Sequence, residues 1–156
     1  MPKFAAVATD FTTPITTPDT AIMIQPDAAG ETGEVIECLM TGSGLTAAAD
    51  TQHTAQLQFS DGTGNGTGTA QTPQPLNQGS AVSEVTVTVE HSAEPSTISA
   101  VAAVLFGFNQ RGGMRWAVPR GEGVFFDNSE TNEDVIWTVV AVAAGKIDAM
   151  VHWWEH

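Results

Sequence analysis

The chain has 156 residues, enough for one domain with a hydrophobic core, and its hydrophobic content of 42% excludes a wholly disordered protein. Eighteen acidic residues against five basic ones give a net charge of −13, which disfavours non-specific binding to nucleic acid and to anionic membranes. We therefore expect no nucleic-acid partner and no membrane partner. The single cysteine, Cys38, excludes an intrachain disulfide and is expected in the core.

The first nineteen residues predict an extended N-terminal arm rather than part of a compact sheet. They are rich in Thr and Pro and show no clear hydrophobic period. Phe4 and Phe11 are apolar enough to need a partner surface, and we expect them to pack on a neighbouring subunit. The segment lacks the apolar region of a signal peptide, so the protein is expected to be soluble and made in the cytoplasm.

Residues 20–156 predict a series of short strands. Residues 52–59 alternate, with His53, Ala55, Leu57 and Phe59 on one face, which is the period of a half-buried strand. The other predicted strands are 20–25, 34–41, 83–90, 98–108, 114–118, 123–126, 135–144 and 147–155.

Turn residues indicate how some of these strands connect. The segment 114–118 follows a Gly-Gly turn and is expected to pair with 98–108, and 135–144 with 147–155 is expected to form a closing hairpin. Residues 60–80 are rich in Gly, Asn and Pro, which predicts a long loop with a functional or packing role. Residues 127–134 are expected to form an acidic loop.

The predicted fold class is all-β, a single-domain antiparallel β-sandwich or jelly roll over 20–156 with an arm over 1–19. The runs 98–108 and 135–144 are apolar on both faces, whereas a strand in a two-sheet sandwich has only one inner face. We expect another chain to cover their outer faces, and the sequence therefore predicts an oligomer.

The last five residues match H-x-x-E-H, the zinc-binding pattern of inverted zinc peptidases. His152 and His156 would have to lie about 6 Å apart, one helical turn, to share a metal. On a strand, four residues span about 13 Å, and the flanking residues favour a strand. If these residues form a strand, as we expect, they cannot bind one zinc ion together.

No other motif supports an enzyme. Gly-rich residues 61–68 lack the spacing of a nucleotide-binding loop or a calcium loop, and Gly42-Ser43-Gly44 lacks the frame of a serine hydrolase. Cys38 has no base close to it in the sequence. We expect no catalytic residues, no metal and no cofactor.

Three of the five basic residues, Arg111, Arg115 and Arg120, fall within one stretch of ten. They are either solvated arginines of a hairpin or an anchor patch for an acidic partner surface, where arginine is favoured.

The chain resembles the small decoration, or cement, proteins that coat the capsids of tailed bacteriophages. The resemblance rests on TAQTPQPLNQGS at 69–80, FGFNQRGGMRW at 106–116 with AVPRGEGVFF at 117–126, and the closing VIWTVVAVAAG and DAMVHWWEH. It covers residues 20–156. It implies a jelly-roll-like domain that forms a homotrimer and sits on the capsid surface of the virion, with the major capsid protein as its partner and an N-terminal arm reaching across the capsid.

On this resemblance, Arg111, Arg115 and Trp116 are the expected anchors to the capsid or to another subunit, with Phe4 and Phe11 in the arm. Trp153 and Trp154 are neighbours on a predicted strand and therefore point to opposite faces. We expect one to enter the core and the other to lie at the subunit interface or against the capsid.

Two alternatives stay open at this point. The first is a tail-fibre or receptor-binding β-module, for which the long loop 60–80 would supply glycan contacts. The second is a carbohydrate-binding module in which Trp153 and Trp154 stack on sugar.

Overall fold

The computed structural model describes residues 1–156 except 29, 47–49, 62–63, 78, 80–81 and 129–133. This part of the chain forms twelve strands and no helix. The strands are β1 (Lys3–Thr12), β2 (Asp19–Gln25), β3 (Thr32–Gly42), β4 (Gln52–Ser60), β5 (Thr67–Gln71), β6 (Gln74–Pro75), β7 (Thr86–Ala93), β8 (Val104–Asn109), β9 (Met114–Ala117), β10 (Val124–Asp127), β11 (Asp134–Ala141) and β12 (Lys146–Glu155). Among the described residues, none belongs to a helix long and apolar enough to cross a membrane.

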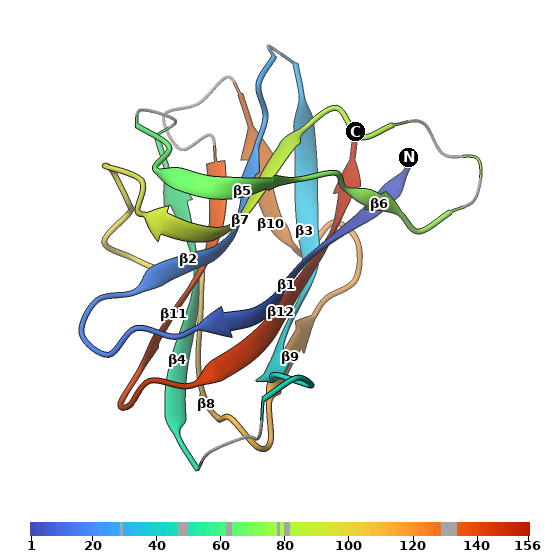
Figure 1. The fold of residues 1–156 in the computed structure, drawn as a ribbon. Helices are drawn as coiled ribbons and strands as arrows, with labels where there is room; N and C mark the ends of the chain where they lie inside the picture. The colour runs from blue at the N-terminus through green and yellow to red at the C-terminus, as the bar shows by residue number, and fades with distance from the viewer. Residues whose placement is uncertain (29, 47–49, 62–63, 78, 80–81, 129–133) are drawn as a thin grey trace.

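The strands form two antiparallel sheets that pack together as a β-sandwich (Figure 1). Sheet A has the order β10-β3-β12-β1-β6, and β9 pairs with another part of β3. Sheet B has the order β5-β7-β2-β11-β4-β8. The predicted all-β sandwich is confirmed, whereas its finer assignment as a jelly roll is not.

The predicted N-terminal arm is not confirmed, because β1 lies inside sheet A. It pairs with β12 on one side, from Lys3 opposite Trp154 to Thr12 opposite Lys146, and with β6 on the other. Alternate residues Phe4, Ala6 and Ala8 face the core and are almost completely buried. Phe4 packs on Trp153 with ring centroids 5.9 Å apart. Phe4 and Phe11 thus find their partner surface within the chain, whereas Ile15 stays 56% exposed.

The chain crosses between the sheets more often than the sequence predicts. β11 belongs to sheet B and β12 to sheet A, so the expected closing hairpin is wrong. The turn between them is tied to the β1–β2 connection, where the Gly145 oxygen accepts a hydrogen bond from the Thr13 backbone nitrogen and Ala141 donates one to the Pro14 oxygen. In the same way, β9 pairs with β3 of sheet A and not with β8.

The core lies between the sheets and is filled by inward-facing residues of both. Trp137 of β11 and Trp153 of β12 are its largest buried side chains. In β4, His53, Ala55 and Leu57 face inward as the alternation predicts. The remaining large, fully buried members include Phe4, Phe126, Ile22, Ile24, Met40, Leu57 and Ile147.

The outer face of β11 is also buried, without a second chain. Ile136 and Thr138 are fully buried although they face away from the core. The connection between β7 and β8 is hydrogen-bonded across this face: Glu94 accepts from Thr20 on β2, and the Ser99 oxygen accepts from Gln58 on β4. Ile136 and Thr138 of this run thus need no second chain for cover, whereas Val142 stays 73% exposed. In the run 98–108, Val101 and Leu105 stay 78% and 62% exposed.

The Gly-rich segment 60–80 contains two of the strands, which its composition did not predict. β5 pairs with β7 at the edge of sheet B, and the two-residue β6 pairs with β1 at the edge of sheet A. Both strands are mostly exposed, and pairing with a neighbour rather than side-chain burial orders them. Residues 62–63, 78 and 80 of this segment and most of the acidic loop 127–134 lie outside the described residues.

Candidate functional site

One side of the sandwich is formed by two edge strands, β8 of sheet B and β9 of sheet A. Within the described chain, β8 pairs with β4 alone and β9 with β3 alone. Residues 98–103 continue the edge of β8 along β4, since Ser99 and Ala103 donate to the Phe59 and Leu57 oxygens. We call this side, residues 98–117, the open flank. Edge strands of this kind carry unpaired backbone groups that can receive another chain.

The turn at 110–113 takes the chain from one sheet to the other. Gln110 is 2% exposed, and its side chain donates to the Lys146 oxygen at the start of β12. Its backbone nitrogen donates to the Thr51 oxygen, and its oxygen accepts from Gly42. Gly113 has a φ of +64°, and a Cβ there would lie 2.7 Å from the Met40 oxygen, so glycine is required. The turn holds β8 and β9 in a fixed relation.

Apolar side chains line the open flank. Register places Phe106 opposite Ala55 and Trp116 opposite Cys38, so both face the interior of the sandwich. They stay only partly buried because no strand of the described residues lies beyond them. Val104 and Met114 have the same position, and Leu105 points outward into solvent. The flank thus offers partly covered aromatic and aliphatic side chains rather than a polar edge.

The charge of this region differs from that of the rest of the chain. Between Glu94 and Glu122 there are three arginines and no acidic residue. The remainder holds two lysines and all eighteen acidic residues, a net charge of −16. All three arginines are exposed, and Arg111 lies in the turn between β8 and β9. The open flank itself holds two of these arginines, Arg111 and Arg115. Acidic residues of other segments lie beside them, because Glu37 pairs with Arg115 and Asp50 accepts from Asn109.

Arg115 is held by an acidic neighbour on the outer face of sheet A. Its Nε donates to Oε1 of Glu37 at 2.6 Å, while its side chain stays 64% exposed. The other oxygen of Glu37 lies 2.9 Å from Nδ1 of His152. Partial burial raises the pKa of Glu37, but the hydrogen bonds and charges of Arg115 and His152 outweigh it and hold the pKa below its usual value. Glu37 thus fixes where the guanidinium points.

Arg120 lies beyond β9, against the outer face of the same sheet. Its guanidinium carbon is 5.8 Å from the centre of the Trp154 ring, a cation–π distance. The loop that carries it is held by Glu34, a fully buried residue whose Oε1 accepts from Gly121 and Gly123 at 2.7 Å each. The half-buried Trp154 is thus covered by an arginine, whereas Trp153 is in the core.

The opposite side of the sandwich is closed by contacts between the sheets. Gln71 of β5 makes two hydrogen bonds with the backbone of Val7 in β1, one from Nε2 and one to Oε1. Glu90 of β7 accepts from the backbone of Thr9. The two sides of the molecule therefore differ in structure, since these contacts join the sheets on one side only of the pair described here.

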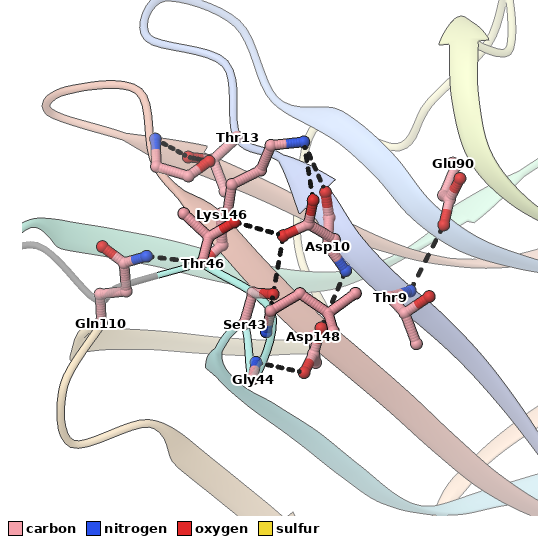
Figure 2. A network of polar contacts seen from close by, with 12 residues as sticks. Thr9, Asp10, Thr13, Ser43, Gly44, Thr46, Glu90, Gln110, Lys146 and Asp148 are labelled. Carbon is pink, nitrogen blue, oxygen red and sulfur yellow. Dashed lines mark hydrogen bonds and ion pairs between the residues drawn. The ribbon is translucent and has the colours of Figure 1, made fainter.

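Figure 2 shows a network of polar contacts around Asp10, near the end of β1. Asp10 accepts hydrogen bonds from Ser43 at 2.7 Å and from Thr46 at 2.9 Å. Lys146 donates to the Asp10 backbone oxygen at 2.8 Å and lies 3.3 Å from its carboxylate. Asp148 accepts from the Asp10 nitrogen. These hydrogen bonds hold together a bulge in β1, the end of β3 and the start of β12, so we interpret the network as structural.

The structure separates the residues that the sequence singled out. Arg111, Arg115 and Trp116 all lie on the open flank, but Trp116 faces the interior of the sandwich whereas Arg115 lies on the outer face of sheet A. Phe4, Phe11 and Trp153 do not join them, because at most 6% of each side chain is exposed and all three pack in the core. Their apolar character reflects core packing rather than a contact with another chain.

The strand assignment of the H-x-x-E-H pattern is confirmed. His152 lies in β12 and His156 directly after it, and the imidazole of His152 pairs with Glu37. The carboxylate of Glu155 points to the opposite face, into the structure, where it accepts from Ser83, Glu84 and Trp153. The three residues of the pattern therefore lie in different environments and do not converge on one site.

The sequence did not point to Val104, Phe106 and Met114 as residues of an exposed site. Their alternation predicts strands but not that those strands are edges. A usable signal was the absence of any charged residue from Pro95 to Gln110 in a chain with so many acidic groups.

No protein-family model matches the chain, and searches of curated proteins and of solved structures returned no match. The resemblance to capsid decoration proteins therefore stays a prediction from sequence motifs.

Proposed function

We propose that the protein is a decoration protein of a tailed bacteriophage, which binds the outer surface of the assembled head as a trimer and stabilises it. The observation that carries the proposal is the open flank. It combines aromatic side chains, exposed aliphatic side chains and arginine, the residue types enriched where proteins dock on one another, on a chain whose net charge is −13.

The mechanism needs no chemistry at the site. A protein that binds the assembled shell and not its free subunits lowers the free energy of the shell by mass action. Each contact can be weak if a trimer engages several capsid subunits at once, because linked contacts raise the effective concentration of the others. The net negative charge disfavours binding to the nucleic acid that such a shell holds.

Heads that lack the protein test the proposal. Purified protein is mixed with expanded heads or with unassembled capsid protein, and bound protein is measured by sedimentation. We expect binding to the heads alone, density on their outer surface in electron microscopy, and a higher temperature of head disruption. Binding to neither preparation would contradict the proposal. In whole virions, density at the tail tip rather than on the head would support a receptor-binding module instead.

A further inference from the structure

We propose that a hollow at the end of sheet A binds the guanidinium group of an arginine side chain from another polypeptide. The hollow lies on the outer face of the sheet, where β10, β3 and β12 lie side by side (Figure 1). Its volume is about 300 Å³, at the lower end of the range for small-ligand sites. We call it the aromatic hollow, and its lining residues are Thr32, Gly33, Phe125, Phe126, Asp127 and His156. The inference goes beyond the proposed function, because it rests on this hollow and not on the open flank.

Strand register brings the functional side chains of the aromatic hollow to one face. Phe125 of β10 and Trp154 of β12 lie opposite the same residue of β3 and face outward. Asp127 lies two residues after Phe125, so it projects from the same face. His156 lies two residues after Trp154, and its backbone nitrogen donates to the Thr32 oxygen, which continues the ladder. Two aromatic rings and a carboxylate thus meet at the end of the sheet.

The two rings form walls of the aromatic hollow. Phe125 is 53% exposed although it is large and apolar, and its ring centre lies 6.3 Å from that of His156 with 35° between the ring planes. The floor is closed from below, because Phe126 is buried beneath Gly33 and a Cβ on this glycine would overlap its ring. An exposed ring attracts a cation to its face and stacks well on a planar one.

Acidic residues surround the aromatic hollow. Among its described lining residues, Asp127 is acidic and none is a lysine or an arginine. On its other side, His156 borders a second, smaller hollow that Glu84 and Glu155 help to line. The segment 127–134, which begins at Asp127, has four acidic residues and no basic residue in its sequence. Charge complementarity therefore favours a cation over a neutral or anionic group.

The basic residues of the same face lie beside Trp154 and do not line the hollow. Lys3 lies opposite Trp154 on β1, so β12 separates it from β3 and β10. Arg120 lies over the Trp154 ring at 5.8 Å. This face thus already holds one arginine on an aromatic ring. The aromatic hollow offers a ring and a carboxylate, and the planar guanidinium of an incoming arginine suits both better than the compact ammonium of a lysine.

Titration with small probes tests the site. N-acetyl-arginine amide supplies the guanidinium, and N-acetyl-citrulline amide has nearly the same shape with an uncharged urea group in its place. Binding is followed at pH 7.5 by the backbone amide signals in NMR spectra. We expect the arginine probe to shift the signals of residues 32–33 and 125–127, and less so as salt is raised, since salt screens exposed charges. Equal shifts with both probes, or none with either, would overturn the proposal.

Two further probes separate other classes of ligand. Tetramethylammonium carries the charge without a planar group, and glucose is a neutral ring. We expect the first to bind more weakly than the arginine probe and the second not to bind. Tighter binding of tetramethylammonium would overturn the assignment to arginine in favour of a free organic amine. Binding of glucose without the arginine probe would identify a sugar site instead.

Substitutions locate the bound probe. Phe125→Leu removes the ring and should weaken binding about two- to fivefold, the effect of an exposed cation–π contact. Asp127→Asn removes the charge and should weaken it by a similar factor, about two- to fivefold. Asp50→Asn makes the same change of charge beyond the other end of β3 and should leave binding at the wild-type level. Equal weakening by Asp127→Asn and Asp50→Asn would show a general charge effect and would overturn the assignment to the hollow.

Folding of the variants is checked in the same spectra. Phe125 is half exposed, so amide signals away from the hollow should not move in Phe125→Leu. If that variant does not fold, Asp127→Asn still decides whether the cation binds at this place.

The two proposals fail in different ways. A protein that binds heads but not the arginine probe would leave the proposed function standing and remove this inference. A protein that binds the probe but no head would do the reverse.

Discussion

Trp153 and Glu155 lie two residues apart on β12 and face the same side of it, and Nε1 of Trp153 donates to the Glu155 carboxylate at 3.0 Å. Both are almost completely buried. The same carboxylate accepts from the hydroxyl of Ser83 and the backbone of Glu84. One acidic residue therefore satisfies the core tryptophan and holds the segment before β7 against the end of sheet A.

Glu155→Ala should destabilise the protein, because it leaves these donors buried without an acceptor. We expect the free energy of unfolding to fall by about 2 kcal/mol, measured by urea denaturation. Glu122→Ala, at an exposed position in the β9–β10 loop, is the control and should change it by less than about 0.5 kcal/mol. Equal midpoints for both variants would show that the buried carboxylate does not stabilise the fold.

Asp10 should make stability depend on pH in the acid range. Hydrogen bonds from Ser43 and Thr46, with the charge of Lys146, hold the pKa of Asp10 below its ordinary value of 3.8. A lowered folded pKa adds stability that is complete above the unfolded pKa and is lost as the pH falls through the folded pKa.

Asp10→Asn tests this dependence, since Asn also tolerates the positive φ of 55° at this position. The wild type should be the more stable protein at pH 6, and the difference should shrink as the pH falls below about 4. Urea midpoints across this range measure it. A constant difference would mean that the carboxylate does not titrate as described.

His53 and His91 should weaken the fold on mild acidification. Burial lowers the pKa of both below 6.5. The unfolded chain then binds more protons than the folded one, so stability falls as the pH drops below 6.5 towards the folded pKa values.

Neither nitrogen of His53 has a hydrogen-bond partner among the described residues, and the ring stacks on Phe108 at 5.1 Å. His53→Phe should therefore fold and lose less stability than the wild type between pH 7 and 5, whereas His156→Ala should behave as the wild type.

Two neighbouring glycines of the β8–β9 turn give a matched pair. Gly113 has a positive φ and no room for a Cβ, whereas a Cβ at Gly112 would have its nearest neighbour at 3.7 Å. Gly113→Ala should lower the free energy of unfolding by at least about 1 kcal/mol, and Gly112→Ala should leave it nearly unchanged. Thermal unfolding of the two variants makes the comparison, and a Gly113→Ala protein as stable as the wild type would contradict the described turn.

Cys38 should be unreactive in the folded protein. Its side chain is fully buried, and burial, with the charge of Glu37, raises the pKa of the thiol well above its usual value. A thiol reagent should modify the native protein only at the rate of unfolding, and the urea-unfolded protein at once. Rapid modification in buffer would show that this part of β3 opens readily.

Strand identity could be predicted from the sequence where alternation is clean. In β7, Val87 and Val89 face the core and Thr86 is exposed, as expected from their period. The same pattern identifies the inward residues of β4. The alternation of apolar and polar residues shows which side chains face the core. In these strands that alternation can be seen in the local sequence alone.

Strand partners could not be predicted in the same way. The turn at Gly145 is compatible with a hairpin, but β11 and β12 each have two better neighbours, and the turn instead crosses the sandwich. For β1, Thr and Pro indicate an arm, whereas burial of Phe4 against Trp153 favours the sheet. In both places the arrangement depends on pairing with strands that are distant in the sequence. The local sequence contains no signal for such pairing.

The candidate site was half predictable. Clustered arginines can be read from the sequence. The structure adds that Arg115 and Trp116 lie on opposite faces of β9, Arg115 against Glu37 and Trp116 against the core. The exposure of Leu105 and the partial cover of Phe106 follow from the position of β8 at a sheet edge. The position of β8 at an edge depends on the order of all the strands in the sheet. That order cannot be predicted from the local sequence.

The pairing of β1 with β12 has a consequence for synthesis. Lys3 lies opposite Trp154, and the two sides of this ladder are separated by almost the whole chain. During synthesis, sheet A therefore cannot form completely until β12 has emerged from the ribosome. Until that point Phe4 lacks Trp153, the side chain on which it packs, and stays exposed. Long-range pairing of this kind folds slowly and leaves apolar strands open to aggregation. Expression at lower temperature, or with chaperones in excess, should raise the soluble yield.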